Sequence, residues 1–342
     1  MLRALVLTVG LLMATPAAAQ IPHASPLVIA HRGASGERPE HTRAAYELAI
    51  DQGADFIEPD LVMSRDGVLV VRHENALSDT TDVADRPEFA DRRRTQTIDG
   101  RRVTDWFSED FTLAELRTLR MRERLPDLRG TAFDGQFGLM TFEEVLDLAD
   151  AASARTGRRI GVVPELKHPT HFATIGLPME PGLIEVLARR GLTGADTPVI
   201  VQSFEVEVLR ALDRSLDVPL MQLISPAGGP FDRPDLTYGA MLTPEGLAGV
   251  ATYADWIGVE AGLVIPRAPD GTAGAATGLV AVAHAAGLKI GVWTLRAENR
   301  FLPVDHRSDD SQAPGDLAGW FRRFEAAGVD ALFTDHPGVA GR

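Results

Sequence analysis

The chain has 342 residues and a net charge of −14, and it is 45% hydrophobic, 24% charged and free of cysteine. This composition is typical of a folded globular protein, and the lack of cysteine excludes a disulfide framework and a thiolate metal site. The acidic balance, without a dense basic stripe, excludes nucleic acid as a partner. An anionic ligand must therefore meet local positive charge from a metal, an arginine or a lysine.

Residues 1–19 have the order of regions found in a secretory signal peptide. Arg3 precedes an apolar run from Ala4 to Met13, and Ala17-Ala18-Ala19 supplies a small-x-small cleavage site. We expect cleavage near Ala19, export to the periplasm and a mature domain of residues 20–342. A single membrane anchor is the alternative, but the apolar run is short for a bilayer span. No later segment is apolar enough to cross a membrane, so we expect no stable membrane association.

Short β-branched runs then alternate with amphipathic stretches along most of the chain. The predicted strands are Leu27–Ala30, Asp55–Leu61, Val68–Val71, Ile160–Glu165, Val199–Gln202, Leu220–Leu223, Trp256–Val259, Ile290–Trp293 and Ala331–Phe333. The predicted helices are Thr42–Gln52, Phe142–Ala154, Leu183–Arg190, Glu205–Leu212, Pro244–Tyr253, Thr277–Ala286 and Leu317–Ala327. Most of the strands are continuous apolar runs, as in parallel strands covered on both faces. The repeated units predict an α/β fold, a TIM (β/α)8 barrel, with a doubly wound open sheet as the alternative.

One stretch, from Asn75 to about Met140, lacks a clear strand–helix pair. It is rich in Asp, Arg and Thr, with a short helix expected after Thr112. We interpret residues 75–140 as an inserted subdomain after the second strand, over the barrel mouth. The run Arg92-Arg93-Arg94 within it is more typical of a solvated face than of a binding patch.

Polar side chains follow the predicted strands at the point where each strand ends. In a TIM barrel that edge holds the active site, and scattered surface charges would not choose the same end of so many strands. The residues concerned are His31, Arg32, Glu58, Asp60, His73, Glu165, Lys167, Gln202, Trp293 and Asp335.

Three of these residues predict a metal site. Glu58 and Asp60 are two apart in one strand, so their carboxylates face the same side, and Glu165 ends another strand. Three carboxylates that converge repel each other unless a cation lies between them. Oxygen ligands favour one hard divalent ion, Ca²⁺ or Mg²⁺, and the sequence has no close-spaced His or Cys set that would favour zinc.

The same edge also carries proton-transfer groups and positive charge. His31 and His73 are the candidate general acid and base, since histidine exchanges a proton near neutral pH. Arg32 and Lys167 supply positive charge for a substrate oxyanion. The sequence contains no P-loop and no G-x-S-x-G nucleophile elbow.

These residues lie in segments that resemble the glycerophosphodiester phosphodiesterases. The matching segments are HRGASGERPEHT (31–42), EPDLVMSRDGVLVVRHE (58–74), PELK (164–167) and GVDALFTDHP (328–337). The segment TDVADR (81–86) and the region around it resemble the bacterial periplasmic members in particular. Two departures stand out: His41 is found where many members have Asn, and Glu74 follows His73 where Asp is commoner.

The resemblance implies an enzyme that hydrolyses small-molecule glycerophosphodiesters to an alcohol and glycerol 3-phosphate. It implies Glu58, Asp60 and Glu165 as ligands of Ca²⁺ or Mg²⁺, with Glu40 in support. It also implies His31 and His73 as acid and base, with Arg32 and Lys167 on the phosphate. Gln202, Phe204 and Trp293 would line the glycerol and head-group pocket. Family members are thought to attack first with the substrate's own neighbouring hydroxyl, which forms a cyclic phosphate.

Two other readings compete with this one. A lipid-directed phospholipase of the same barrel type needs an exposed apolar rim, and aromatic residues make up only 6% of the chain. A non-catalytic binding protein on a dead barrel would have lost one or more of the three carboxylates or the two histidines, and all five are present.

Overall fold

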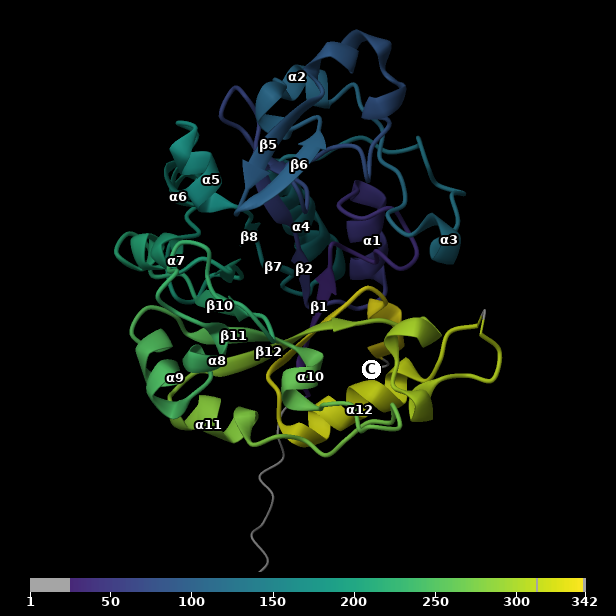
Figure 1. Ribbon diagram of the computed structural model, residues 1–342, viewed down its shortest axis with the longest axis vertical. Coiled ribbons are helices and arrows are strands. Elements are labelled where there is room, and N and C mark those ends of the chain that lie inside the picture. The colour runs from purple at the N-terminus through teal and green to yellow at the C-terminus, as the bar shows by residue number, and fades with distance from the viewer. Residues whose placement is uncertain (1–24, 312, 341–342) are drawn as a thin grey trace, which may run out of the picture.

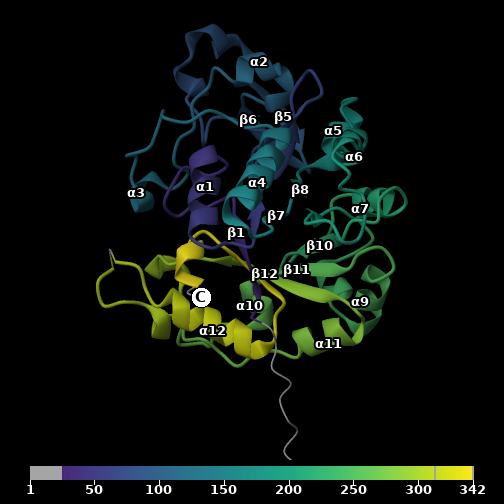
Figure 2. The ribbon, with the colours of Figure 1, turned by 180° about the vertical axis from the view of Figure 1, so that it is seen from behind.

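The structure is a computed structural model that describes residues 25–311 and 313–340. The predicted signal peptide, residues 1–19, lies outside the described residues. Figures 1 and 2 show the strands near the centre of the molecule, with helices around them and the segment before α4 at the top.

Most of the strands form one sheet of eleven, and two form a separate hairpin. The large sheet has the order β4-β3-β8-β9-β10-β11-β12-β13-β1-β2-β7, and the hairpin pairs β5 with β6. The bounds are β1 Leu27–His31, β2 Phe56–Glu58, β3 Asp60–Met63, β4 Leu69–Val71, β5 Arg94–Ile98, β6 Arg101–Asp105, β7 Gly161–Val162, β8 Glu165–Leu166, β9 Val201–Ser203, β10 Leu220–Ile224, β11 Trp256–Glu260, β12 Lys289–Leu295 and β13 Ala331–Thr334.

The large sheet is curled, and two prolines divide two of its strands. Pro59 separates β2 from β3 and Pro164 lies between β7 and β8, because proline cannot donate a hydrogen bond to the ladder. Strand β1 pairs with β2 and β13, β2 pairs with β7, and β3 pairs with β8. Parallel pairing continues from β8 through β9, β10, β11 and β12 to β13. The pairings therefore return to β1, which an open doubly wound sheet would not do.

Strand β4 is not a further parallel strand of this circuit, although its sequence is a continuous apolar run. It is antiparallel to β3, with Leu61 opposite Val71 and Met63 opposite Leu69. The two strands form a hairpin, so the chain returns to the level of Asp60 when β4 ends. This reversal decides where His73 lies.

Helices follow most of the strands and cover the outside of the sheet (Figures 1 and 2). Their bounds are α1 Arg43–Asp51, α2 Leu113–Leu116, α3 Pro126–Arg129, α4 Phe142–Thr156, α5 Pro169–Thr174, α6 Met179–Arg189, α7 Val206–Asp213, α8 Tyr238–Met241, α9 Pro244–Val250, α10 Ala261–Val264, α11 Leu279–Ala285 and α12 Leu317–Ala327. Helix α4 begins with a reciprocal capping box between Thr141 and Glu144, which satisfies two backbone N–H groups at its start. None of these helices has both the length and the apolar character needed to cross a bilayer.

The apolar core has two parts. A small inner cluster is formed by Ile29, Val163, Ile200, Met221, Leu223, Trp256, Ala331 and Phe333, which come from or next to six strand positions around the curled sheet. A larger outer cluster lies between the sheet and its helices. The inner cluster closes the floor beneath the carboxyl ends of the strands.

The stretch from Asn75 to Met140 contains the β5–β6 hairpin, the short helices α2 and α3, and three segments of 3-10 helix at 83–85, 87–92 and 108–110. Its buried Phe89, Phe111 and Met121 belong to the same apolar cluster as the residues between sheet and helices. The stretch therefore packs on the main core.

Candidate active site

A cavity of about 390 Å³ opens at the carboxyl ends of the strands. Its lining includes nine of the ten residues predicted to bind metal, bind substrate or transfer protons: His31, Arg32, Glu58, His73, Glu165, Lys167, Gln202, Phe204 and Trp293. Asp60 is the exception; it is 1% exposed and lies behind the lining, where Lys167 and Arg32 contact it. The structure thus brings all ten residues to one place.

Strand register places the three carboxylates together. Asp60 is paired with Glu165, Glu165 with Gln202, and Glu58 with His31. Glu58, Asp60 and Glu165 are all buried, and each offers an oxygen such that the three oxygens lie within 4.8 Å of one another. The arrangement is a buried acidic cluster that could hold a metal ion.

The electrostatics of the cluster fit a cation. Burial, followed by repulsion from Asp60 and Glu165, raises the pKa of Glu58 well above its usual range. Burial likewise raises the pKa of Glu165 to about 8, with Asp60 adding to the effect and Lys167 opposing it. Burial also opposes ionisation of Asp60, but Lys167, His73 and Arg32 hold its pKa well below the usual value. A divalent ion would relieve this repulsion, and an all-oxygen donor set suits Ca²⁺ or Mg²⁺.

Arg32 and Lys167 bind the cluster as well as facing the cavity. Arg32 has a φ of 59° and Gly33 a φ of 86°, a left-handed turn that directs the Arg32 backbone N–H to Glu58 Oε2 at 2.9 Å. A Cβ atom at Gly33 would lie 2.7 Å from the backbone of Ala45, so α1 packs directly on this turn. Lys167 Nζ lies 2.6 Å from Glu165 and 3.2 Å from Asp60. Both positively charged side chains are therefore held beside the acidic cluster.

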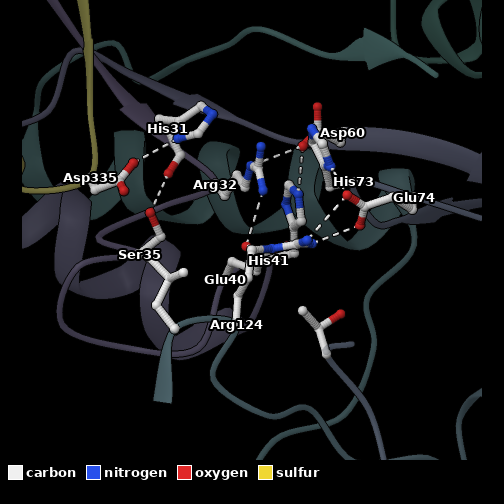
Figure 3. Close-up of polar contacts among 12 residues, drawn as sticks. His31, Arg32, Ser35, Glu40, His41, Asp60, His73, Glu74, Arg124 and Asp335 are labelled. Atoms are coloured by element: carbon white, nitrogen blue, oxygen red, sulfur yellow. Dashed lines mark hydrogen bonds and ion pairs between the residues drawn. The ribbon is translucent and has the colours of Figure 1, made fainter. Parts of the chain in front are cut away.

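His31 is oriented by Asp335, at the end of β13. Its Nδ1 lies 2.7 Å from Asp335 Oδ1, and Asp335 Oδ2 accepts bonds of 2.6 Å from both Arg129 and Arg296 (Figure 3 shows the His31–Asp335 contact). Burial and then Arg32 lower the pKa of His31 to about 4, while the Asp335 carboxylate stays ionised. A neutral His31 must then carry its proton on Nδ1, which leaves the Nε2 lone pair for the cavity.

His73 has the same kind of support from Glu74. Because β4 runs back along β3, Arg72 N donates to Asp60 O and His73 follows beside the acidic cluster. His73 Nδ1 contacts Glu74 Oε1, and Arg124 bonds to both oxygens of Glu74 at 3.1 and 2.8 Å (Figure 3). Burial, then Arg32 and Lys167, lower the pKa of His73 to about 3. The sequence departure at Glu74 is thus accommodated by a side chain that still reaches the ring.

Several supporting residues had not been assigned these roles from the sequence. His41 is fully buried and bridges Tyr46 Oη and Asp60 Oδ2, each at 2.9 Å, so it orients a cluster carboxylate rather than a substrate. Arg124 also binds Glu40 through both carboxylate oxygens, at 2.7 and 2.6 Å. Arg129 lies 206 positions from its partner Asp335, and no local pattern signals such a pairing. His171, in α5, is buried against Glu109, with its Nε2 3.0 Å from Glu109 Oε1.

Two lining residues near the cluster, Gln202 and Trp293, carry polar atoms that lack partners among the described residues. Gln202 Nε2 donates to Glu58 Oε1 at 3.1 Å, while Gln202 Oε1 and the Trp293 indole N–H are buried without a hydrogen bond from the described residues. The Phe204 ring packs edge-on against Trp293 at 5.8 Å. A buried polar atom without a partner costs free energy, so these two atoms are candidates for a hydrogen bond to a bound ligand.

Fold and site together define a class of protein: a curled parallel α/β sheet whose strand ends carry an acidic cluster and two carboxylate-bound histidines, an arrangement suited to hydrolysis at phosphorus. The model of the glycerophosphoryl diester phosphodiesterase family matches residues 31–339. The chain belongs to this family, and it is an enzyme that hydrolyses phosphoric diesters.

Relatives from plants and bacteria support this assignment. The chain is 35% identical to a glycerophosphodiester phosphodiesterase of Arabidopsis thaliana, covering 92% of this chain and 84% of the relative. It is 30% identical to one from Haemophilus influenzae, covering 68% of each. In structure it resembles an Oleispira antarctica phosphodiesterase solved with the product sn-glycerol-3-phosphate, with a TM-score of 0.60, 20% identity and coverage of 92% and 94%. Because the chain is similar to a plant relative as well as to bacterial ones, its resemblance to the bacterial periplasmic members in particular stays a prediction.

Proposed function

We propose that this enzyme hydrolyses glycerophosphodiesters to an alcohol and glycerol 3-phosphate, with one divalent cation held by Glu58, Asp60 and Glu165 and with His31 and His73 as acid and base. The observation that carries the proposal is the arrangement of the two histidines. Each lines the cavity beside the acidic cluster, and each is held at Nδ1 by a carboxylate that an arginine fixes in turn.

The histidines would divide the proton transfers between them. Both are neutral in the free enzyme and both direct Nε2 away from the carboxylate that holds Nδ1, so either ring can accept a proton. One removes the proton of the attacking hydroxyl, and the other, once protonated, delivers its proton to the leaving alkoxide. The ionised Asp335 and Glu74 stabilise the imidazolium form of each ring.

The remaining residues would bind and orient the diester. Arg32 and Lys167 face the phosphoryl oxygens, while Gln202 Oε1 and the Trp293 N–H bind hydroxyl groups against the Phe204 ring. The bound cation, Ca²⁺ or Mg²⁺, would polarise the phosphoryl oxygens and acidify the attacking hydroxyl. The glycerol hydroxyl next to the ester is already bound, which favours it over water as the first nucleophile. Its attack would release the head-group alcohol and leave a cyclic glycerol phosphate, which water would then open to glycerol 3-phosphate.

Phosphorus NMR of the reaction tests the proposal. The purified enzyme should convert glycerophosphoglycerol to glycerol 3-phosphate, lose activity on chelation and recover it with Ca²⁺ or Mg²⁺. Glu165→Gln should bind the cation weakly, whereas Glu109→Gln, a matched control at a buried carboxylate outside the cavity lining, should bind it normally. Full turnover by metal-stripped enzyme, or a product other than glycerol 3-phosphate, would contradict the proposal.

The architecture and location carry proposals of their own. Closure of the strand pairings supports a TIM (β/α)8 barrel, with residues 75–140 as an insertion at its mouth. Signal-peptide cleavage near Ala19 would place the enzyme in the periplasm. The lipid-directed alternative gains no support, because the large hydrophobic residues exposed in the described part of the chain are far apart in the sequence. They are Ile175, Phe231, Val304 and Val339.

A further inference from the structure

The outer end of the cavity differs in charge from the inner end. The loops that follow β11 and β12 place Arg267, Arg296 and Arg300 on the cavity lining, opposite the strands that carry the acidic cluster. Glu260 is the one carboxylate of the lining at this end, and its Oε2 accepts a bond from Gly262 N at the start of α10. Three arginines thus face one carboxylate in a chain whose net charge is −14.

Two of these arginines are not neutralised by a carboxylate of the described residues. Arg296 is neutralised by Asp335, at 2.6 Å. Arg267 donates to the backbone oxygen of Phe301 at 2.6 Å, and Arg300 lies over the Phe301 ring at 5.2 Å. Neither Arg267 nor Arg300 makes an ion pair with a carboxylate of residues 25–311 or 313–340. Both residues are exposed and both line the cavity, so they can meet a ligand that enters it.

The aromatic residues at this end do not offer a cage for a cationic head group. Arg296 as well as Arg300 lies over the Phe301 ring, at 4.8 Å. Trp320 packs against His306 and Phe324, with ring centroids 5.4 and 4.7 Å apart. A quaternary ammonium group attracted to an aromatic face would meet two guanidinium groups at Phe301, and the repulsion between like charges in a partly enclosed cavity opposes its binding.

We infer that the outer end of the cavity is a subsite for an anionic head group, one that carries a phosphate or a carboxylate, with Arg267 and Arg300 as its specificity-determining residues. The inference rests on the proposed function, because it assumes that the phosphodiester lies at the acidic cluster. The head group of such a diester points away from the cluster, and the outer arginines are the groups that meet it. A neutral polyol head group would then be intermediate, and choline would be the poorest.

The test compares four glycerophosphodiesters on the metal-loaded enzyme. Their alcohols are glycerol 3-phosphate, 3-hydroxypropionate, glycerol and choline. At low ionic strength kcat/KM for the two anionic diesters should exceed that for the choline diester on the order of tenfold. The ratio should shrink as salt screens the exposed arginines. Comparing the diester of glycerol 3-phosphate with that of 3-hydroxypropionate shows whether the subsite prefers a phosphate or a carboxylate.

Variants then assign the effect to the two arginines. Arg267→Gln and Arg300→Gln should each lower kcat/KM for the anionic diesters about fivefold, as for a partly exposed ion pair, and leave the choline diester unchanged or improved. Arg267→Lys and Arg300→Lys keep the charge and should keep most of the preference. Arg43→Gln, at an exposed arginine on α1 outside the cavity lining, should behave as wild type.

The outcomes are distinct for this inference and for the proposed function. An enzyme that cleaves none of the four diesters would overturn the proposed function. An enzyme that cleaves them all with choline equal to or better than the anionic head groups, or whose preference survives in the Arg267→Gln/Arg300→Gln double variant, would overturn only the anionic subsite.

Discussion

Replacing Arg129 with glutamine should impair one histidine and replacing Arg124 should impair the other, so the two variants separate the roles of His31 and His73. Arg129 lies on α3 and bonds to Asp335 and Glu298, each at 2.6 Å, while Arg124 holds Glu74 and Glu40. The two arginines are five positions apart in the same stretch of chain. Arg129→Gln therefore weakens the support of His31, and Arg124→Gln weakens the support of His73.

The expected magnitudes follow from burial and from the bonds that remain. The Arg129 side chain is 8% exposed and Asp335 3%. Removing one partner of such a pair costs about 3–5 kcal/mol, and the lower end applies because Arg296 and His31 still bind Asp335. At about 2 °C per kcal/mol for a large domain, Tm should fall by about 6 °C. The turnover loss should be about tenfold to a hundredfold, below the ceiling of about 10⁴ for removing an acid or a base.

The assay uses two leaving groups. Choline leaves as an alkoxide that must be protonated, whereas 4-nitrophenolate leaves without a proton. The variant that disturbs the acid should lose kcat on the choline diester and keep it on glycerol 4-nitrophenyl phosphate, and the variant that disturbs the base should lose both. Arg158→Gln, which breaks bonds to the Ile50 and Ala54 carbonyls before β2, should lower Tm and keep kcat. Equal losses on both substrates in both variants would refute the division into acid and base.

The other predictions concern the metal, the histidines, the nucleophile and export. Calorimetry should show weaker cation binding in each of the three carboxylate variants, Glu58→Gln, Asp60→Asn and Glu165→Gln. Wild-type affinity in any one of them would show that its residue does not bind the metal. His31→Ala and His73→Ala should each lose on the order of 10²–10⁴ in kcat with near-normal Tm and cation affinity, and wild-type turnover would show that the residue has no proton-transfer role. A 2-deoxy glycerol diester should have a much lower kcat/KM than the parent, because attack by the neighbouring hydroxyl through a cyclic phosphate is then impossible; comparable values would point to water as the nucleophile. Mass spectrometry of periplasmic protein should find an N-terminus close to Gln20, and an intact leader on cytoplasmic protein would count against export.

The structure brings the predicted residues together because they stand at the same end of neighbouring parallel strands. Glu58 and Asp60 belong to one strand position, and parallel pairing brings Glu165 beside Asp60. The patterns that mark strand ends therefore also mark the residues that meet there.

The parts that the sequence did not predict depend on distant pairings and on chain reversal. His73 was expected beside the cluster because it follows a parallel strand, yet it lies there because β4 is antiparallel to β3. An apolar run of four residues does not distinguish the two directions. Arg124 and Arg129 lie in a stretch without regular periodicity, and their partners are 50 and 206 positions away, so only the fold reveals them.

The most direct test of the central claim is a crystal structure of the enzyme with Ca²⁺ or Mn²⁺ and glycerol 3-phosphate. Anomalous scattering should place one cation within bonding distance of Glu58, Asp60 and Glu165, with the phosphate between His31 and His73 and in contact with Arg32 or Lys167. A cation bound elsewhere, or a phosphate held away from both histidines, would contradict the account.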